Sequence, residues 1–167
     1  YFASLGKDLK FIKNSFYEQA KCINSYIDFF YLDVMSSFKE CKIAIDAISQ
    51  FKKKILIGIH IRDDGKLPSG EHFYDVVKKL EKYKPLGIMS SCVSVEHFRY
   101  LLKKKKKINV PFGFKINAFE HIPAGWKPDS NNPKVQLGKR NDLTPNKFFR
   151  ICKEFNKKGA NIIGGCC

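Results

Sequence analysis

Five short apolar runs alternate with amphipathic, helix-like segments along most of the chain, and this alternation limits the possible folds more than any other feature. The runs are DFFYLDV (28–34), ILIGIHI (55–61), LGIMS (86–90), FGFKINA (112–118) and ANIIGG (160–165). Short, nearly continuous apolar runs are typical of strands in parallel sheets that helices cover. The repeat therefore predicts an α/β fold with a parallel sheet, although the spacing does not distinguish an open sheet from a barrel.

Helix-start signals lie between these runs. The segment SFKE (37–40) has the spacing of a capping box, and Thr144 followed by Pro145 is typical of an N-cap with proline at the first helical position. Ser94 precedes apolar residues that recur at helical spacing. The segment SFYE (15–18) has the capping-box spacing as well, so a helix start is also expected there.

Composition and charge narrow the possible function classes. The chain has 167 residues, is 44% hydrophobic and carries a formal net charge of +15, and LKKKKKI (102–108) contains five consecutive lysines. These values indicate a globular domain with a basic surface. Arginine occurs only at positions 62, 99, 140 and 150, whereas nucleic-acid recognition usually relies on arginine. A solvated lysine-rich surface is favoured, and a nucleic-acid-binding module stays an alternative.

Targeting signals and disulfides are not expected. No apolar run reaches the roughly 18 residues of a membrane-spanning helix, and the first residues lack a signal-peptide layout. Three of the six cysteines, Cys22, Cys41 and Cys152, fall in helix-like segments, where free thiols behave as small hydrophobes. We therefore expect a cytoplasmic protein with reduced thiols and no membrane partner.

Polar side chains and thiols gather where the predicted strands end. The set comprises Asp33, His60, Arg62, Cys92, Asn117, Cys166 and Cys167. Functional groups of parallel sheets and barrels collect at the carboxyl ends of the strands, so three thiols from two strands would share one rim. Three thiols suffice for a Zn²⁺ site with one open coordination position, which would hold a substrate sulfur as its thiolate.

Several simpler interpretations stay open at this point. The run GGCC (164–167) is also compatible with a tight turn that carries two inert thiols, or with a vicinal-dithiol redox or metal-sensing protein that does not use Cys92. His60 is better interpreted as a hydrogen-bonded interior histidine than as a metal ligand. Asp33 and Asn117 could simply cap the turns that follow them.

The quoted segments resemble the homocysteine S-methyltransferase family. The segment GANIIGGCC (159–167) is similar to the last barrel strand of that family, and ASLG (3–6) resembles the end of its third strand. DFFYLDVMSSFKECKIAI, IGIHIRDDGKLPSGEHF, LGIMSSCVSVEHF and VPFGFKINAF are similar to the fourth to seventh strand segments. The resemblance implies a (β/α)8 TIM barrel of which residues 1–167 form part, roughly the fourth to eighth strands, with the N-terminal strands preceding Tyr1.

The resemblance also implies site residues. It makes Cys92, Cys166 and Cys167 the zinc ligands. Asp33 stands where the family has a glutamate that contacts the amino group of the substrate, and Asn117 matches an asparagine near the pocket. An ungapped register would place Ser90 on the metal, but serine is a poor zinc ligand. We therefore expect Cys92 there, with two extra residues relative to the family pattern that a bulge at the strand end accommodates.

The implied activity is the zinc-dependent transfer of a methyl group from a small donor to the thiol of homocysteine, which gives methionine. Both partners are small molecules, and the sequence does not identify the donor. The long segment 120–142, which contains Trp126, is expected to line the donor side. Because half a barrel leaves an open sheet edge, we expect zinc binding and catalysis to depend on the preceding strands.

Overall fold

The computed structural model describes residues 8–62, 64–104, 106–120, 122 and 137–167. Its strands are β1 (Phe29–Met35), β2 (Lys54–Ile59), β3 (Gly87–Val93), β4 (Phe112–Asn117) and β5 (Ile162–Cys166). Its α-helices are α1 (Leu9–Ile23), α2 (Phe38–Ile48), α3 (Phe73–Leu80), α4 (Val95–Lys103) and α5 (Pro145–Lys157). Short 3₁₀ turns follow three of the helices, η2 (Asn24–Tyr26), η3 (Ser49–Phe51) and η4 (Glu81–Tyr83).

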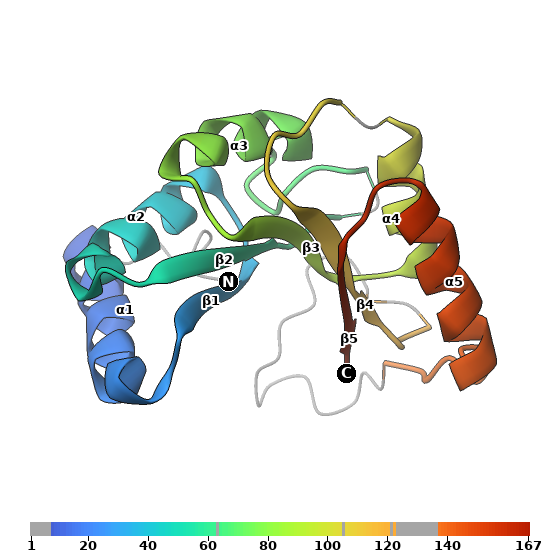
Figure 1. Cartoon of the computed structure of the whole chain (residues 1–167), viewed down its shortest axis with the longest axis horizontal. Coiled ribbons are helices and arrows are strands. Elements are labelled where there is room, and N and C mark those ends of the chain that lie inside the picture. The colour runs from blue at the N-terminus through green and yellow to red at the C-terminus, as the bar shows by residue number, and fades with distance from the viewer. Residues whose placement is uncertain (1–7, 63, 105, 121, 123–136) are drawn as a thin grey trace.

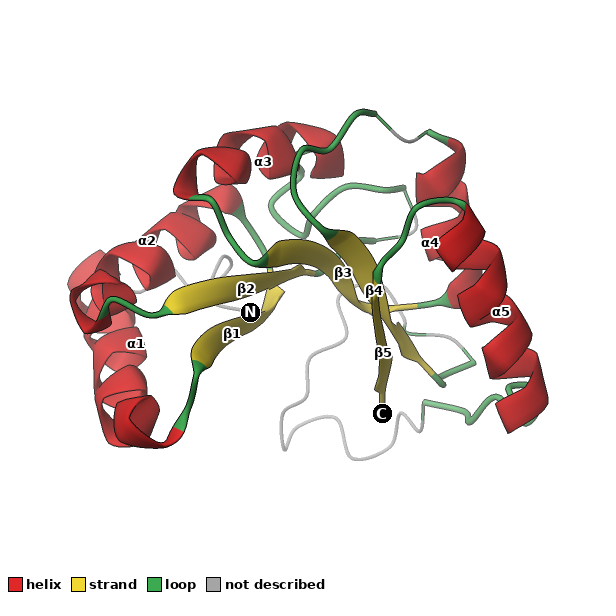
Figure 2. Ribbon diagram, viewed as in Figure 1, coloured by secondary structure: helices red, strands yellow, loops and turns green. Residues whose placement is uncertain are grey.

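The strands form one parallel sheet in the order β1-β2-β3-β4-β5. The helices form an arc on the outside of this sheet (Figures 1 and 2), and we call the opposite face, which none of the described helices covers, the open face. The prediction of an α/β fold with a parallel sheet is confirmed. A five-stranded parallel sheet with outer helices is consistent with part of a TIM barrel.

The core lies between the sheet and the helices. Ile57, Ile59 and Ile88 of the central strands are fully buried. On β4, the ring of Phe114 packs against those of Phe98 from α4 and Phe155 from α5, with ring centroids 5.0 and 5.3 Å apart. Because alternate residues of a strand point to opposite faces, the residues between these core positions point to the open face.

Local capping explains where most helices begin. Ser37 Oγ accepts a hydrogen bond from the Glu40 backbone N–H at 3.0 Å, as a capping box requires. The Glu40 carboxylate, however, accepts from the Ser36 backbone N–H at 2.7 Å rather than from Ser37. Thr144 Oγ1 accepts from the Lys147 backbone N–H at 3.3 Å, so the predicted start of α5 is confirmed.

The expected helix start at SFYE (15–18) is wrong. Helix α1 begins at Leu9, where the Asp8 carboxylate accepts from the Lys10 backbone N–H at 3.0 Å. Ser15 therefore lies inside the helix, and its hydroxyl donates to the Phe11 carbonyl at 2.9 Å. Since an aspartate is an equally good N-cap, the helix extends upstream of the serine, whose side chain instead bonds the preceding turn.

Two sequence expectations fall on residues that the structure does not describe. The segment ASLG (3–6) and Trp126 both lie outside the described residues. Among the helices of the described part of the chain, none has the length and apolar character needed to cross a membrane.

Candidate metal centre

The open face carries two adjacent rows of side chains near the carboxyl ends of the strands. One row contains Ser91, Lys115 and Gly164, which are register partners across β3, β4 and β5. The next row contains Asn117 and its partner Cys166. The alternation of side chains along each strand thus places Lys115, Asn117 and Cys166 on the same face.

A β-bulge delivers Cys92 to this face. Ser91 pairs with Lys115 and Val93 pairs with the next residue, Ile116, so Cys92 is an extra residue on β3. Its φ of 55° lies in the left-handed region. In a regular strand Cys92 itself would be opposite Ile116 and would point toward the helices, but Val93 takes that place and is buried there. The expectation of a bulge at this strand end is confirmed.

Ser90, the other candidate for the first ligand position, lies on the helix-covered face. It pairs with Phe114 and is fully buried. The described residues offer its hydroxyl oxygen no hydrogen-bond partner. Its place in the core separates Ser90 from the thiols of the open face.

Three sulfur atoms from two strands converge at the rim. The Sγ atoms of Cys92, Cys166 and Cys167 all lie within 4.8 Å of one another, and those of Cys166 and Cys167 are 3.3 Å apart. Neighbouring residues of a strand normally point to opposite faces. Cys167, with a φ of 48°, has left the extended conformation, so its thiol can lie beside that of Cys166.

The donor set and its spacing suit a thiophilic divalent cation. Thiolates favour Zn²⁺ over Mg²⁺ or Ca²⁺. With Zn–S bonds of about 2.3 Å and tetrahedral angles, ligand sulfurs are separated by about 3.8 Å. The observed range, from 3.3 Å for the vicinal pair to a limit of 4.8 Å for all three, includes this value. Three ligands leave one position of a tetrahedral site open, which is the pattern of catalytic rather than structural zinc.

The environment keeps the thiols of Cys92 and Cys166 protonated when no cation is bound. Burial raises the pKa of Cys92, and burial together with the neighbouring Cys167 thiol raises the pKa of Cys166 to about 12. The Lys115 ammonium acts in the opposite direction on Cys166, but its effect is smaller. Metal binding at this cluster would therefore have to displace protons.

Asn117 fixes the bulge that carries Cys92. Its Nδ2 donates to the Cys92 carbonyl at 3.0 Å and lies 3.9 Å from the Cys92 sulfur, while its Oδ1 accepts from the Phe119 backbone N–H at 3.2 Å. The side chain is 3% exposed. Asn117, which the resemblance places near the substrate pocket, thus contacts the first cysteine of the cluster.

Asp33 lies at the end of β1, and its carboxylate forms an ion pair with the ammonium group of Lys115. Sequence reasoning missed Lys115, although a lysine within the apolar run FGFKINA, two residues before Asn117, indicates a charge on the same face. Next to this pair, burial raises the pKa of Tyr31, whose hydroxyl lies 2.6 Å from Ser91 Oγ.

His60 stays apart from the sulfur cluster. Its Nδ1 lies 3.3 Å from the Ser91 carbonyl oxygen, and the residue is buried. Within the residues that the structure describes, the set whose ligand atoms could hold a metal ion consists of the three cysteines. These observations agree with the interpretation of His60 as a hydrogen-bonded interior histidine.

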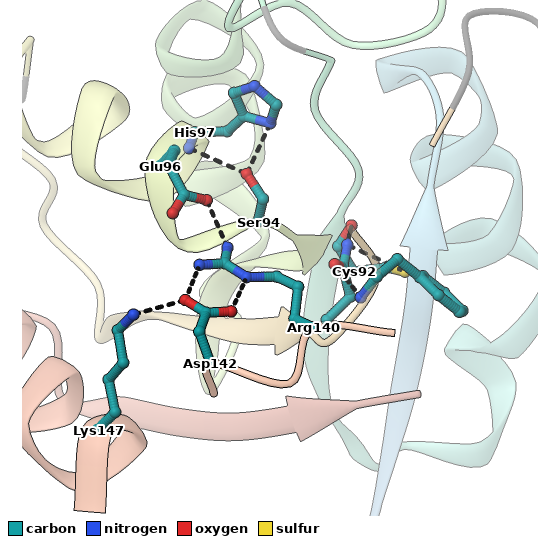
Figure 3. A network of polar contacts seen from close by, with 9 residues as sticks. Cys92, Ser94, Glu96, His97, Arg140, Asp142 and Lys147 are labelled. Carbon is teal, nitrogen blue, oxygen red and sulfur yellow. Dashed lines mark hydrogen bonds and ion pairs between the residues drawn. The ribbon is translucent and has the colours of Figure 1, made fainter. Parts of the chain in front are cut away.

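Ion pairs fasten the end of the 120–142 segment near the same rim. The Arg140 guanidinium donates to Glu96 at 2.7 Å and to both carboxylate oxygens of Asp142 at 3.0 and 2.9 Å. Lys147 of α5 binds Asp142 at 2.5 Å (Figure 3). These contacts hold Arg140 against the first turn of α4, where Glu96 lies four residues after Cys92 in the sequence.

Comparison with known proteins identifies the family. A search of curated proteins found no match. The model of the family described as homocysteine S-methyltransferase, by contrast, matches residues 3–167, which is nearly the whole chain. The match includes the strand ends that carry the three cysteines and Asn117. The chain therefore belongs to the homocysteine S-methyltransferase family.

Proposed function

We propose that the protein transfers a methyl group from a small donor to the thiol of homocysteine, giving methionine, with Zn²⁺ as cofactor. Family membership indicates a thiol methyltransferase. The observation that carries the proposal is the convergence of three sulfurs within 4.8 Å at one rim of the sheet. A vicinal-dithiol sensor would need only Cys166 and Cys167 and gives no reason for the bulge that brings Cys92 to them.

Each residue of the rim has a role in this proposal. Cys92, Cys166 and Cys167 would hold the zinc ion, and Asn117 would fix the position of Cys92 through its carbonyl. Bound zinc would lower the pKa of a substrate thiol, so that the thiolate is available at neutral pH. Asp33 would accept a hydrogen bond from the ammonium group of the substrate.

The chemical step needs positioning rather than a protein nucleophile. The substrate sulfur forms a bond to the methyl carbon of the donor while the bond between that carbon and the donor breaks, and the two must lie in line. Holding both reactants in this geometry removes much of the entropic cost of a bimolecular reaction. We place the donor opposite the cysteine cluster, without assigning residues to it.

The proposal extends to fold and location. We assign the five strands to the fourth to eighth strands of a (β/α)8 barrel because their segments resemble those strands of the family, and their sequential, parallel order is consistent with this assignment. All six cysteines are free, which suits a reducing compartment, so we propose the cytoplasm.

Zinc analysis combined with a methyl-transfer assay tests the function. The test uses the protein expressed at its full natural length, because zinc binding and catalysis are expected to need the whole barrel. The purified protein should contain about one zinc per chain and convert homocysteine to methionine with one of betaine, S-methylmethionine, a dimethylsulfonium compound or a methylfolate. Cys92→Ser should lose most of the zinc and the activity. The matched control is Cys152→Ser, which removes a thiol from α5 and should keep both.

Two outcomes would contradict the proposal. Zinc content that is unchanged in Cys92→Ser would exclude the three-sulfur site and favour the vicinal dithiol. A zinc-loaded protein without turnover on any donor would separate the family fold from the family chemistry.

A further inference from the structure

An ion pair crosses the open face next to the sulfur cluster. Lys115 lies on β4 and Asp33 on β1, and two strands, β2 and β3, separate these elements in the sheet. The pair can form because the curved sheet turns both side chains toward one another. The Lys115 side chain is 18% exposed and that of Asp33 is 37% exposed, so both charges can meet a ligand from the open side.

The ammonium group of Lys115 is held in place by more than Asp33. It lies 5.4 Å from the centroid of the Tyr31 ring, within range of a cation–π contact. That ring is fixed in turn, because the Tyr31 hydroxyl and Ser91 Oγ form a hydrogen bond of 2.6 Å. A lysine that contacts both a carboxylate and an aromatic face is preorganised. Ligand binding therefore does not have to restrict its side chain further.

The ion pair and the thiols are close enough to contact one small molecule. Lys115 precedes Asn117 by two residues on the same face, and Asn117 is the register partner of Cys166. Two residues along a strand span about 7 Å. In homocysteine, ordinary bond lengths place the sulfur about 4 Å from the α-carbon and about 6 Å from the carboxylate. A thiol bound at the cysteine cluster would thus bring its α-carbon substituents to the ion pair.

We infer that Lys115 and Asp33 together bind the zwitterionic end of an amino-acid thiol. Asp33 accepts a hydrogen bond from the α-ammonium group, and Lys115 donates to the α-carboxylate. This assignment rests on the proposed function and adds to it a residue, Lys115, that selects the substrate. The charges of Asp33, Lys115 and the two α-carbon substituents of the ligand then alternate in sign. Each carboxylate contacts an ammonium group, and each ammonium group contacts a carboxylate.

The pair discriminates because a ligand with only one charge disturbs it. A thiol with an amine but no carboxylate would bring a second cation to Asp33 and leave Lys115 facing a like charge. A thiol with a carboxylate but no amine would bring a second anion to Lys115 and leave Asp33 facing a like charge. Placing like charges together against the wrong ligand is a common source of specificity. The site should therefore prefer thiols that carry both groups.

Three thiols and three variants test this assignment by isothermal titration calorimetry of the zinc-loaded protein. The ligands are homocysteine, 3-mercaptopropylamine, which lacks the carboxylate, and 4-mercaptobutyrate, which lacks the amine. Wild type should bind homocysteine about 10- to 100-fold more tightly than either analogue, the range expected for one charge-assisted hydrogen bond. Because the affinities are compared as ratios, the contribution of the common thiol cancels.

The variants should exchange these preferences. Lys115→Met should weaken the binding of homocysteine by the same factor, about 10- to 100-fold. The affinity for 3-mercaptopropylamine should stay unchanged or increase, so that the preference for a carboxylate disappears. Lys115→Arg should retain it. Asp33→Asn should remove the preference for an amine and spare 4-mercaptobutyrate. If Lys115→Met does not fold, as judged by circular dichroism, Lys115→Gln is measured in its place.

The outcomes distinguish this inference from the proposed function. If Lys115→Met weakens all three ligands equally, or if the preference for a carboxylate survives, the role assigned to Lys115 is wrong even when methyl transfer occurs. If the exchanged preferences are observed but no donor methylates homocysteine, the binding role of Lys115 and Asp33 is supported and the proposed activity is wrong. If no thiol binds at all, both this inference and the proposed function are wrong.

Discussion

Replacing Gly58 by alanine should disturb the open face without touching the cysteines. Gly58 lies on β2, and the Tyr31–Ser91 hydrogen bond passes directly over it. A Cβ atom at this position would lie 2.1 Å from Ser91 Oγ, 2.7 Å from the Tyr31 hydroxyl and 3.0 Å from Tyr31 Cε2. Real Cβ atoms do not approach other atoms so closely, so the hydroxyl groups and the ring must move apart.

The magnitude follows from three contributions. The hydrogen bond between Tyr31 and Ser91 is worth about 0.5–1.5 kcal/mol. Forcing the ring and the neighbouring strand to adjust adds about 1–3 kcal/mol. Alanine in a strand regains about 0.5–1 kcal/mol relative to glycine. The free energy of unfolding should therefore fall by about 1–3 kcal/mol, and the displaced Tyr31 ring should no longer support Lys115.

Urea unfolding, followed by circular dichroism, measures this effect. The midpoint should fall by about 1 M with an unchanged m-value. Gly165→Ala is the matched control, because a Cβ atom there meets no other atom within 4 Å. It should leave the free energy of unfolding within about 0.5 kcal/mol of wild type.

A double-mutant cycle separates this steric argument from a general intolerance of β2. Ser91→Ala removes the oxygen atom that the new Cβ would meet at 2.1 Å, so Gly58→Ala should cost less in that background than in wild type. If Gly58→Ala is as stable as wild type, or if its cost is the same in both backgrounds, the packing described for this face is refuted.

Three further effects can be measured. Thr144→Ala removes the N-cap of α5 and should lower the free energy of unfolding by about 1 kcal/mol in thermal or urea denaturation. Arg99 lowers the pKa of Glu154 to about 2 through paired hydrogen bonds of 2.9 and 2.8 Å. That ion pair should therefore stabilise the fold above about pH 4.5 and lose its effect as the pH falls toward 2. Because Glu154 is one-third exposed, Glu154→Gln should cost only about 1 kcal/mol at pH 7 and nothing at the acid end of a pH series of unfolding curves. Since burial raises the pKa of Cys166 to about 12, zinc affinity measured by chelator competition should rise between pH 6 and 8, by about tenfold per unit for each proton released.

Local signals in the sequence were sufficient for most of the scaffold. The run FGFKINA at 112–118 became β4 at Phe112–Asn117, and ANIIGG at 160–165 became β5 at Ile162–Cys166. These strands are short and apolar and alternate with helix-like segments, so the local sequence pattern was enough to predict them. The wrong helix start predicted at SFYE (15–18) shows the limit of local signals, because the spacing of a capping box also occurs inside helices.

The contacts that define the site depend on residues far apart in the sequence. Lys115 and Asp33 are 82 positions apart, and only the curvature of the sheet brings them together. Strand periodicity places Lys115 on the face of Asn117 from the sequence alone. Nothing in the sequence says which residue of another strand it meets. The convergence of Cys92 with the terminal cysteines followed from the resemblance to the family, whereas spacing alone left it open.

The backbone conformation at the strand ends explains why these side chains converge. Among the described strand pairs, the register shifts between β1 and β2 near Val34 and between β3 and β4 at Cys92. Val34 and Cys92 both have a φ of 55°, a conformation that costs a non-glycine residue about 1–2 kcal/mol. Val34 directly follows Asp33, and Cys92 supplies the first sulfur. At these two strand ends, which carry site groups, an extra residue thus redirects a side chain that a regular strand would point elsewhere.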